Sequence, residues 1–357
     1  MRRLEIVQIG LGHVGRAVAQ IVLEERKRWL ERRGVEVRYR AVSDTSGALV
    51  GEDLLPQAVR LKEEGGWLSD LGTEPLEDVL RSEPEPGLAR VVVDVAVHGG
   101  TFDLDLLGIE NGSYLVLSNK GPLSGSTAEY ERLVNEVPDR LWHEATVGAG
   151  MPIISTIGGL IETGDEILEI QASPSGTLGF VMSAVEAGRS FSEAVREAVD
   201  LHYAEPDPRD DLSGLDVARK AIILARMMGR GIEPEEIPYE SLVPDGLEDV
   251  PLDEFMARLP DHDEAFAARM AAVEDHHMLR YLTRIPREGR VTVGLAETPV
   301  ESPFGPISGP ENVFDFRTRR YSDVTLTVRG PGAGPDRTAS GVVWDLLDIA
   351  HRALRDD

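Results

Sequence analysis

LEIVQIGLGHVGRAVAQIVL, residues 4–23, combines an apolar run, a glycine-rich turn and the start of a helical pattern. The run predicts a strand, and Gly10-Leu11-Gly12-His13-Val14-Gly15 matches the G-x-G-x-x-G pattern that joins a strand to a helix. In that pattern the first glycine permits a tight turn, the second lets a pyrophosphate approach the backbone, and the third lets the helix pack closely on the strand. The sequence therefore predicts a dinucleotide site, with the helix N-terminus facing the anion.

Further apolar runs indicate the fold class. Those at 35–42, 89–97 and 114–117 are rich in valine and are separated by helical or charged segments, which favours a parallel sheet covered on both faces. We predict an α/β protein with an N-terminal Rossmann-type, doubly wound parallel sheet at 1–147, completed by a C-terminal segment at about 330–357. Residues 148–329 are predicted to form an α+β domain for substrate binding, catalysis and dimerisation, with helices at 176–187, 190–200 and 213–229 and strands at 166–172, 278–284, 290–296, 312–317 and 323–329.

Composition excludes several classes of protein. The 63 Asp and Glu residues outnumber the 37 Lys and Arg residues, giving a formal net charge of -26, so a nucleic-acid partner is not expected. There is no cysteine, which excludes disulfides, thiolate nucleophiles and cysteine-based metal sites. With neither an apolar run of membrane-spanning length nor a signal-peptide pattern, we expect a cytoplasmic protein without membrane contact.

Two segments bear on the cofactor. Asp44 ends the second predicted strand, where an acidic residue commonly binds the ribose 2′-hydroxyl, and between 41 and 61 the sole basic residue is Arg60. This pattern favours NAD over NADP. The alternative is that Asp44 forms an Asx turn in the sequence S-D-T-S-G. Gly334, in a glycine-rich stretch before the last predicted helix, either touches the cofactor or belongs to a turn.

Lysine is nearly absent from the chain. The sequence holds four lysines, of which Lys27 and Lys62 lie in charged helical stretches. Lys120 follows the fourth predicted strand in SNKGP, at the sheet edge where ligands bind in open parallel sheets. An ammonium there can meet a substrate carboxylate or lie near the nicotinamide; the alternative is an ordinary lysine in a surface loop.

The fourth lysine ends the densest group of polar residues, YAEPDPRDDLSGLDVARK at 203–220. Ser213 is predicted to cap the following helix, which places Asp216 and Lys220 four residues apart on one face. The helical neighbours of Lys220 are apolar, so the lysine is expected to be partly desolvated beside carboxylates and able to exchange a proton. The alternative is a capping box with a solvated ion pair.

Two shorter segments have both a functional and a structural interpretation. HEATVGAGMP at 143–152 either turns backbone carbonyls toward a hard cation or is a tight crossing of the chain. Ser175-Gly176-Thr177, which precedes a predicted helix, either binds a carboxylate or is an ordinary N-cap.

Taken together, these motifs resemble homoserine dehydrogenase, in the compact form that lacks a regulatory ACT domain. The resemblance covers nearly the whole length, and its most specific part is the pattern D-P-x-x-D-L-x-G-x-D-x-x-x-K at 207–220. The chain departs from the family at Val95-Ala96-Val97, Pro174 and His202. Other segments that carry the resemblance are GLGHVG at 10–15, SNKGP at 118–122, HEATVGAGMPIIS at 143–155, SGTLGF at 175–180, ENVFDFRTRRY at 311–321, GPGAG at 330–334 and TAS at 338–340.

The resemblance implies NAD(P)-dependent interconversion of L-homoserine and L-aspartate 4-semialdehyde, on the route to threonine and methionine, by a homodimer formed through the second domain. Alternatives are another amino-acid dehydrogenase, such as an aspartate dehydrogenase, and a non-catalytic NAD-binding sensor. The implied roles are Lys220 as general acid/base positioned by Asp216; Asp211 near the amino acid; Glu205 at the substrate amino group; Lys120 near substrate and cofactor; Tyr203, Gly176 and Thr177 lining the pocket; and Glu144, Val147, Ala149 and Met151 holding a monovalent cation of the sodium type.

Overall fold

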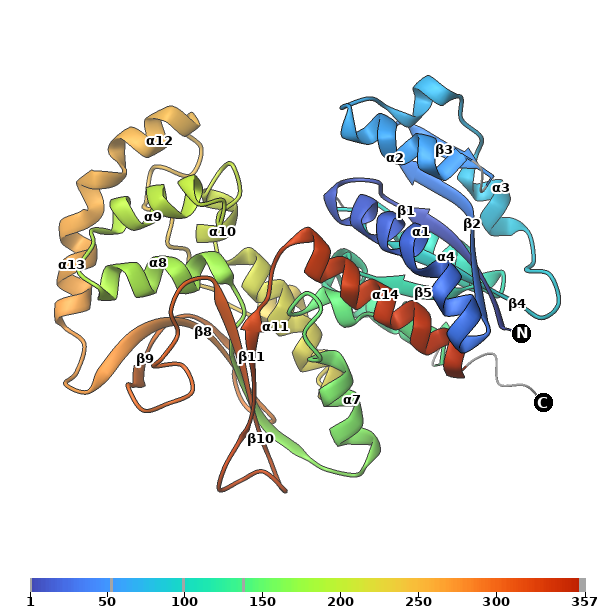
Figure 1. The fold of residues 1–357 in the computed structure, drawn as a ribbon. Coiled ribbons are helices and arrows are strands. Elements are labelled where there is room, and N and C mark those ends of the chain that lie inside the picture. The colour runs from blue at the N-terminus through green and yellow to red at the C-terminus, as the bar shows by residue number, and fades with distance from the viewer. Residues whose placement is uncertain (1, 52–53, 98–99, 137–138, 353–357) are drawn as a thin grey trace. The chain divides into compact units, whose positions relative to one another are not determined.

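The computed structural model describes residues 2–51, 54–97, 100–136 and 139–352. The chain divides into two compact units (Figure 1). Unit 1 consists of Met1–Gly150 together with Gly334–Asp357, and unit 2 of Met151–Ala333. The sequence analysis predicted these domain boundaries at residue 147 and at about residue 330.

Unit 1 is built on a six-stranded sheet in the order β3-β2-β1-β4-β5-β6. All neighbouring strands are parallel except β3, which runs antiparallel to β2 at the edge. This arrangement confirms the predicted Rossmann-type sheet, although the short β3 was not foreseen. The chain order reverses between β1 and β4, which creates the crevice where such sheets bind ligands. The strands are β1 Arg2–Ile9, β2 Val35–Asp44, β3 Gly47–Val50, β4 Leu88–Asp94, β5 Tyr114–Leu117 and β6 Leu141–Trp142.

The last helix of the chain completes the core of unit 1. The helix α14, Pro335–Arg352, packs along α1, His13–Arg33, and both contact the same buried cluster (Figure 1). Leu4 of β1, Val18 of α1 and Val342 of α14 are each 0% exposed. The remaining helical segments are α2 Leu55–Glu63, η2 Leu68–Leu71, α3 Leu76–Arg81, α4 Phe102–Glu110, α5 Gly121–Ser124, α6 Thr127–Glu136 and η3 Glu144–Thr146.

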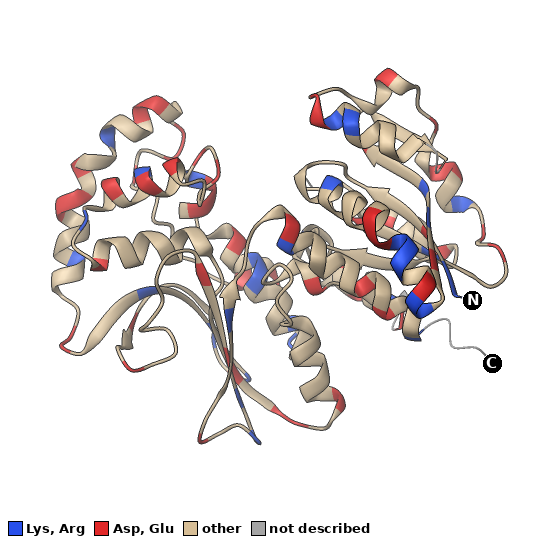
Figure 2. Ribbon diagram, in the orientation of Figure 1, with Lys and Arg blue, Asp and Glu red and all other residues tan. Residues whose placement is uncertain are grey.

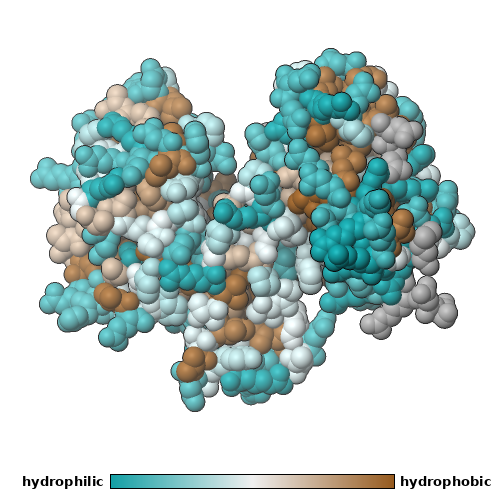
Figure 3. Space-filling model, viewed as in Figure 1, coloured by the Kyte–Doolittle hydropathy of each residue, from teal (hydrophilic) through white to brown (hydrophobic). Residues whose placement is uncertain are grey.

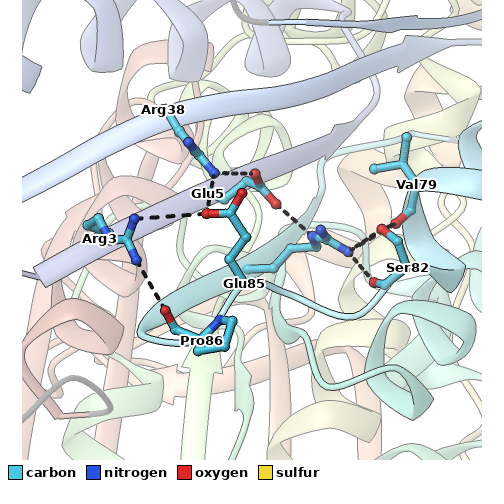
Figure 4. Close-up of polar contacts among 8 residues, drawn as sticks. Arg3, Glu5, Arg38, Val79, Ser82, Glu85 and Pro86 are labelled. Carbon is cyan, nitrogen blue, oxygen red and sulfur yellow. Dashed lines mark hydrogen bonds and ion pairs between the residues drawn. The ribbon is translucent and has the colours of Figure 1, made fainter.

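A buried ion pair joins the two central strands of unit 1 (Figure 4). Arg90 of β4 donates to Glu5 of β1 over 2.8 Å, and both residues are 4% exposed. The same guanidinium donates to the carbonyls of Val79 and Ser82, while Arg38 of β2 donates to the second oxygen of Glu5. An arginine suits this position because its planar fork presents several donors at once.

Unit 2 contains a five-stranded antiparallel sheet in the order β11-β10-β7-β8-β9. The helices α8 and α11 contact its strands, and α9 packs on α8. The strands are β7 Ile167–Ser173, β8 His277–Pro286, β9 Thr292–Pro299, β10 Glu311–Thr318 and β11 Leu326–Pro331; the helical segments are α7 Ile154–Glu162, α8 Gly176–Glu186, α9 Phe191–Asp200, α10 Arg209–Leu212, α11 Leu215–Met227, η4 Pro234–Glu236, α12 Leu252–Arg258, η5 Leu259–His262 and α13 Asp263–Ala271.

The net negative charge is spread over both units. Figure 2 shows acidic residues on helices of each, among them α1, α9 and α13. On the face seen in Figure 3 hydrophilic residues predominate, and apolar residues form smaller groups. In the part of the chain that the structure describes, we find no helix that combines the length and the hydrophobicity of a membrane span.

Candidate active site

The glycine loop of unit 1 connects β1 to α1 as predicted. Gly10 has a φ of 99°, and a Cβ on it would lie 3.0 Å from the backbone of Ala96. A Cβ on Gly15 would lie 2.2 Å from the carbonyl oxygen of Gly10, whereas a Cβ on Gly12 would meet no atom within 4 Å. The first and third glycines are thus required by the fold, and the second leaves open space beside the start of a helix, which fits a bound pyrophosphate.

The other residues of the glycine loop differ in their exposure to solvent. Leu11 is 1% exposed, His13 is exposed and Val14 is half-buried. Gly334 has a φ of 117° and lies directly before α14, a conformation typical of a turn. A cavity of about 310 Å³ in unit 1 is lined by His13, Arg16, Ala17, Gln20, Glu63, Pro335 and Asp336.

Asp44 lies at the end of β2, but its carboxylate already has partners. Its Oδ1 accepts from the backbone and side chain of Ser46, which is the Asx turn considered from the sequence. Its Oδ2 lies 2.8 Å from the ammonium of Lys62, which also stacks 4.6 Å from the ring centroid of Trp67. Although burial opposes it, these donors lower the pKa of Asp44, with Lys62 contributing most among them.

Lys62 is a residue that the sequence analysis missed at this site. Lys62 directly follows the segment 41–61 and lies in a charged, helical stretch of the sequence. In the structure α2 returns toward β2 and brings the ammonium to the predicted ribose-binding carboxylate. Because Asp44 has a cation beside it, the charges around this residue do not favour NAD over NADP.

Lys120 lies at the carboxyl end of β5, as the sequence predicted from SNKGP. It directly precedes the short helix α5, and the side chain of Asn119 beside it is buried. Asn119 and Gly121, on either side of the lysine, are joined by a hydrogen bond from the backbone N–H of Gly121 to Asn119 Oδ1. The position of Lys120 is thus set by a closed turn and not by an open loop.

Lys220 lies in unit 2 on the buried face of α11. The residue is 7% exposed, and its helical neighbours Val217, Ile223 and Leu224 are at most 2% exposed. Its Nζ donates to the carbonyl of Pro174 over 2.6 Å and lies 2.7 Å from Asp216 Oδ2. Because Asp216 keeps 47% of its side chain exposed, the pair joins a buried ammonium to a carboxylate that reaches water.

The start of α11 differs from the prediction. Ser213 was expected to cap this helix, but the N-cap is Gly214, with a φ of 76°, and Ser213 follows the end of α10. Gly214 is needed because a Cβ there would lie 1.9 Å from the hydroxyl of Tyr281. The structure therefore does not contain a capping box between Ser213 and Asp216. Asp216 and Lys220 still form the ion pair that their spacing predicted.

The predicted substrate residues of unit 2 form one hydrogen-bonded cluster. Thr177 Oγ1 lies 2.9 Å from Asp211 Oδ1 and 2.5 Å from the carbonyl oxygen of Tyr203. The backbone N–H of Glu205 donates to Asp211 Oδ2 over 2.8 Å. The side chains of Tyr203 and Glu205 remain exposed, so the cluster has a rigid base and an accessible rim.

Helix α8 begins beside this cluster. Ser175 caps it by accepting from the backbone N–H of Leu178, which is the ordinary N-cap considered from the sequence. A Cβ on Gly176 would lie 3.2 Å from the carbonyl oxygen of Pro310. Since Pro174 holds the Lys220 ammonium, the proposed proton donor and the start of α8 lie together.

Asp211 has an unusual ionisation. Burial raises its pKa to about 6, although the hydrogen bonds from Glu205 and Thr177 oppose this shift. A carboxyl group with this pKa changes charge within the range in which many enzymes are assayed, which is frequent at functional sites.

The segment 144–151 contains left-handed backbone at two consecutive positions. Ala149 has a φ of 56° and Gly148 one of 82°, and such a conformation in a non-glycine residue is costly. Glu144, Val147, Ala149 and Met151 are all buried, and the N–H of Glu144 donates to Asp345. Among the described residues no three His, Asp or Glu side chains form a metal cluster, so a cation here would depend on backbone oxygens and Glu144.

Comparisons with known proteins agree on one family. A family model described as homoserine dehydrogenase matches residues 152–347. The homoserine dehydrogenase of Saccharomyces cerevisiae is 32% identical over 98% of this chain and 98% of its own length. The chloroplastic bifunctional aspartokinase/homoserine dehydrogenase 1 of Zea mays is 37% identical over 96% of this chain. The chain spans 38% of the length of that maize relative.

Solved structures show the same fold. A hyperthermophilic archaeal homoserine dehydrogenase in complex with NADPH aligns with a TM-score of 0.75 and 26% identity over 99% of both chains. A protein of unknown function from Candida auris aligns with a TM-score of 0.86 and 29% identity, again over 99% of each. The similarity therefore extends over both units.

Proposed function

Because the chain belongs to the homoserine dehydrogenase family, we propose that it interconverts L-homoserine and L-aspartate 4-semialdehyde with a nicotinamide cofactor. The observation that supports this most strongly is the buried Lys220, held between Asp216 and the Pro174 carbonyl beside the Thr177–Asp211 cluster. A bound nicotinamide supplies or accepts the hydride. The chain has to orient the substrate and move one proton.

Each unit provides one part of this chemistry. In unit 1 the open space at Gly12 and the start of α1 fit a dinucleotide pyrophosphate, and Lys120 lies at the sheet edge where the nicotinamide is expected. In unit 2 Glu205 and Asp211 bind the substrate ammonium, and Tyr203, Gly176 and Thr177 line the pocket. For reduction, the Lys220 ammonium would give a proton to the aldehyde oxygen; for oxidation, the neutral amine would take the proton from the hydroxyl.

The direct test follows NAD(P)H absorbance with L-homoserine, with L-aspartate and without substrate. We expect reduction of the cofactor with L-homoserine alone. Turnover with L-aspartate would indicate another amino-acid dehydrogenase, and cofactor binding without turnover would indicate a sensor. Running the assay with both cofactors tests the role of Asp44. A strong preference for NADP would refute a direct contact of its carboxylate with the ribose and would indicate that Lys62 binds the 2′-phosphate.

Asp211 gives a prediction on pH. With a pKa of about 6, its carboxylate becomes neutral as the pH falls through 6, so the attraction for the substrate ammonium is lost. We expect the KM for L-homoserine to rise as the pH is lowered from 7 to 5, by up to about tenfold per pH unit below 6. Asp211→Asn should have a high KM throughout this range. The exposed neighbour in Asp210→Asn should keep the wild-type profile, and a flat wild-type KM would contradict the assignment.

The raised pKa of Asp211 also lowers the stability of the folded protein at neutral pH. Since the pKa of Asp211 is raised in the folded protein, ionisation costs free energy of folding as the pH rises from about 4 to about 6. The carboxyl group is therefore retained at the expense of stability at neutral pH, as expected of a functional group.

We further propose that Glu144, Val147, Ala149 and Met151 hold a monovalent cation of the sodium type. The strained backbone at Ala149 and the buried acidic pair of Glu144 and Asp345 support this. The cation should raise the Tm in NaCl above that in choline chloride at equal ionic strength. Glu144→Gln should remove the difference, and the exposed Glu162→Gln should keep it; equal values for the wild type would refute the site.

Homodimerisation through unit 2 is also a proposal, and it follows from the family likeness. Its measurement is size by sedimentation in buffer of moderate ionic strength. A monomer at micromolar concentration would contradict it.

A further inference from the structure

Asp94 forms a buried polar network at the carboxyl end of β4. The residue is 0% exposed. Its Oδ1 accepts from the backbone N–H of Ala96 over 2.9 Å, and its Oδ2 accepts from Thr101 Oγ1 over 2.7 Å and from Asn119 Nδ2 over 2.9 Å. Asn119 Nδ2 also donates to Thr101 Oγ1. These donors are uncharged, so neutral hydrogen-bond donors stabilise the Asp94 carboxylate.

A second acid lies beside it. Asp105 of α4 is 0% exposed, and neither of its carboxyl oxygens has a hydrogen-bond partner within the usual distance among the described residues. Burial and then the neighbouring Asp94 raise the pKa of Asp105 well above its ordinary value. Burial also raises the pKa of Asp94, against the lowering effects of Ala96, Thr101, Asn119 and the neighbouring Asp105. Two buried acids are costly, and apolar residues of similar size would usually stabilise a core better.

The network extends to both sides of Lys120. The backbone carbonyl of Asp94 accepts from the N–H groups of Ser118 and Asn119 over 2.9 and 3.3 Å. The side chain of Asn119 in turn binds Asp94 through its amide nitrogen and the N–H of Gly121 through its oxygen. The backbone before and after Lys120 is therefore tied to one carboxyl residue on the adjacent strand.

We propose that Asp94 is a positioning residue that fixes, through Asn119, the backbone from which Lys120 projects. This inference rests on the proposed function, because it gives Lys120 a role beside substrate and cofactor. It explains why a buried carboxylate is kept at the crevice between β1 and β4, where a purely structural position would favour an apolar side chain.

A reversal of the hydrogen bond tests the proposal. In Asp94→Asn two amide groups meet, and in Asn119→Asp two carboxylates meet. The double variant restores one donor and one acceptor, because the new amide at position 94 donates to the new carboxylate at 119, which still accepts from Gly121. We expect each single variant to lower kcat for L-homoserine at least about tenfold with NADPH affinity within about threefold, and the double variant to return within about threefold of wild type.

Two further variants separate positioning from stability. Asn119→Ala removes the side chain that links Asp94 to Gly121, without changing Asp94 itself, and should also lower kcat about tenfold. Val92→Ala, which truncates a side chain that is 0% exposed on the same strand, should lower the Tm and leave kcat within about twofold. If Asn119→Ala keeps wild-type kcat, or if a folded double variant is no better than the worse single variant, the proposal is wrong.

A readout without turnover distinguishes this failure from failure of the proposed function. With four lysines in the chain, labelling by an amine reagent and mass spectrometry reports Lys120 against the exposed Lys27. The single variants should change the labelling rate of Lys120 at least about threefold and the double variant should restore it. Absence of wild-type turnover with L-homoserine would refute the proposed function, while unchanged Lys120 labelling in the single variants would refute the positioning role.

Discussion

Lys220→Ala should lower kcat for L-homoserine by about 10²- to 10⁴-fold, the contribution typical of a general acid or base, while the Kd for NADPH stays within about twofold. The expected separation follows from the structure, because Lys220 contacts Asp216 and the Pro174 carbonyl in unit 2, whereas the glycine loop belongs to unit 1. Steady-state kinetics and fluorescence titration measure the two quantities.

Controls for this variant come from the same residue type. Lys27, whose side chain is 84% exposed on α1, should tolerate Lys27→Ala with kcat within about twofold. Lys220→Arg keeps the positive charge but gives up a proton far less readily, so its kcat should fall nearly as far as in Lys220→Ala. Near-wild-type kcat in the alanine variant would eliminate the proposed proton transfer. The Tm of each variant shows whether any loss comes from unfolding.

Gly12→Ala should weaken NADPH binding about 10- to 100-fold, or ~1.4–2.8 kcal/mol, with little change in Tm. A Cβ at Gly12 meets no protein atom within 4 Å, and the φ of -75° suits any residue. The added methyl group would instead occupy the space proposed for the pyrophosphate. Isothermal titration or nucleotide fluorescence gives the affinity.

Gly15→Ala provides the contrast. Its Cβ would lie 2.2 Å from the carbonyl oxygen of Gly10, so both the Tm and NADPH affinity should fall. Gly158→Ala, where the added atom also meets nothing within 4 Å, should change neither much. If Gly12→Ala binds NADPH as tightly as wild type, the dinucleotide does not lie against this loop.

The fold could be predicted largely from local patterns. The strands β1, β2 and β5 follow from apolar runs, and the turn at 10–15 follows from glycine spacing, because these features depend on neighbours in the chain. The edge strand β3 was missed since Gly47–Val50 is short and pairs in an antiparallel direction that no periodicity signals.

The site was less accessible to prediction wherever distant residues determine it. Lys62 reaches Asp44 only after α2 folds back. The N-cap of α11 is Gly214, and Tyr281, 67 positions later, leaves no room there for a Cβ. The buried acid pair of Asp94 and Asp105 gave no pattern in the sequence. By contrast, the burial of Lys220 could be predicted because its helical neighbours are apolar, a property of spacing on a single helix.

The return of α14 to unit 1 has a consequence for biosynthesis. Unit 2 interrupts unit 1, so the ribosome must translate all 183 residues from Met151 to Ala333 before the helix that covers β1 and α1 is made. At about 5–20 residues per second this delay lasts roughly 10–40 s. During that time the nascent sheet exposes the apolar surface that Val342 and its neighbours later cover. Unit 2 is therefore the first of the two to have its whole sequence available, and unit 1 is completed last.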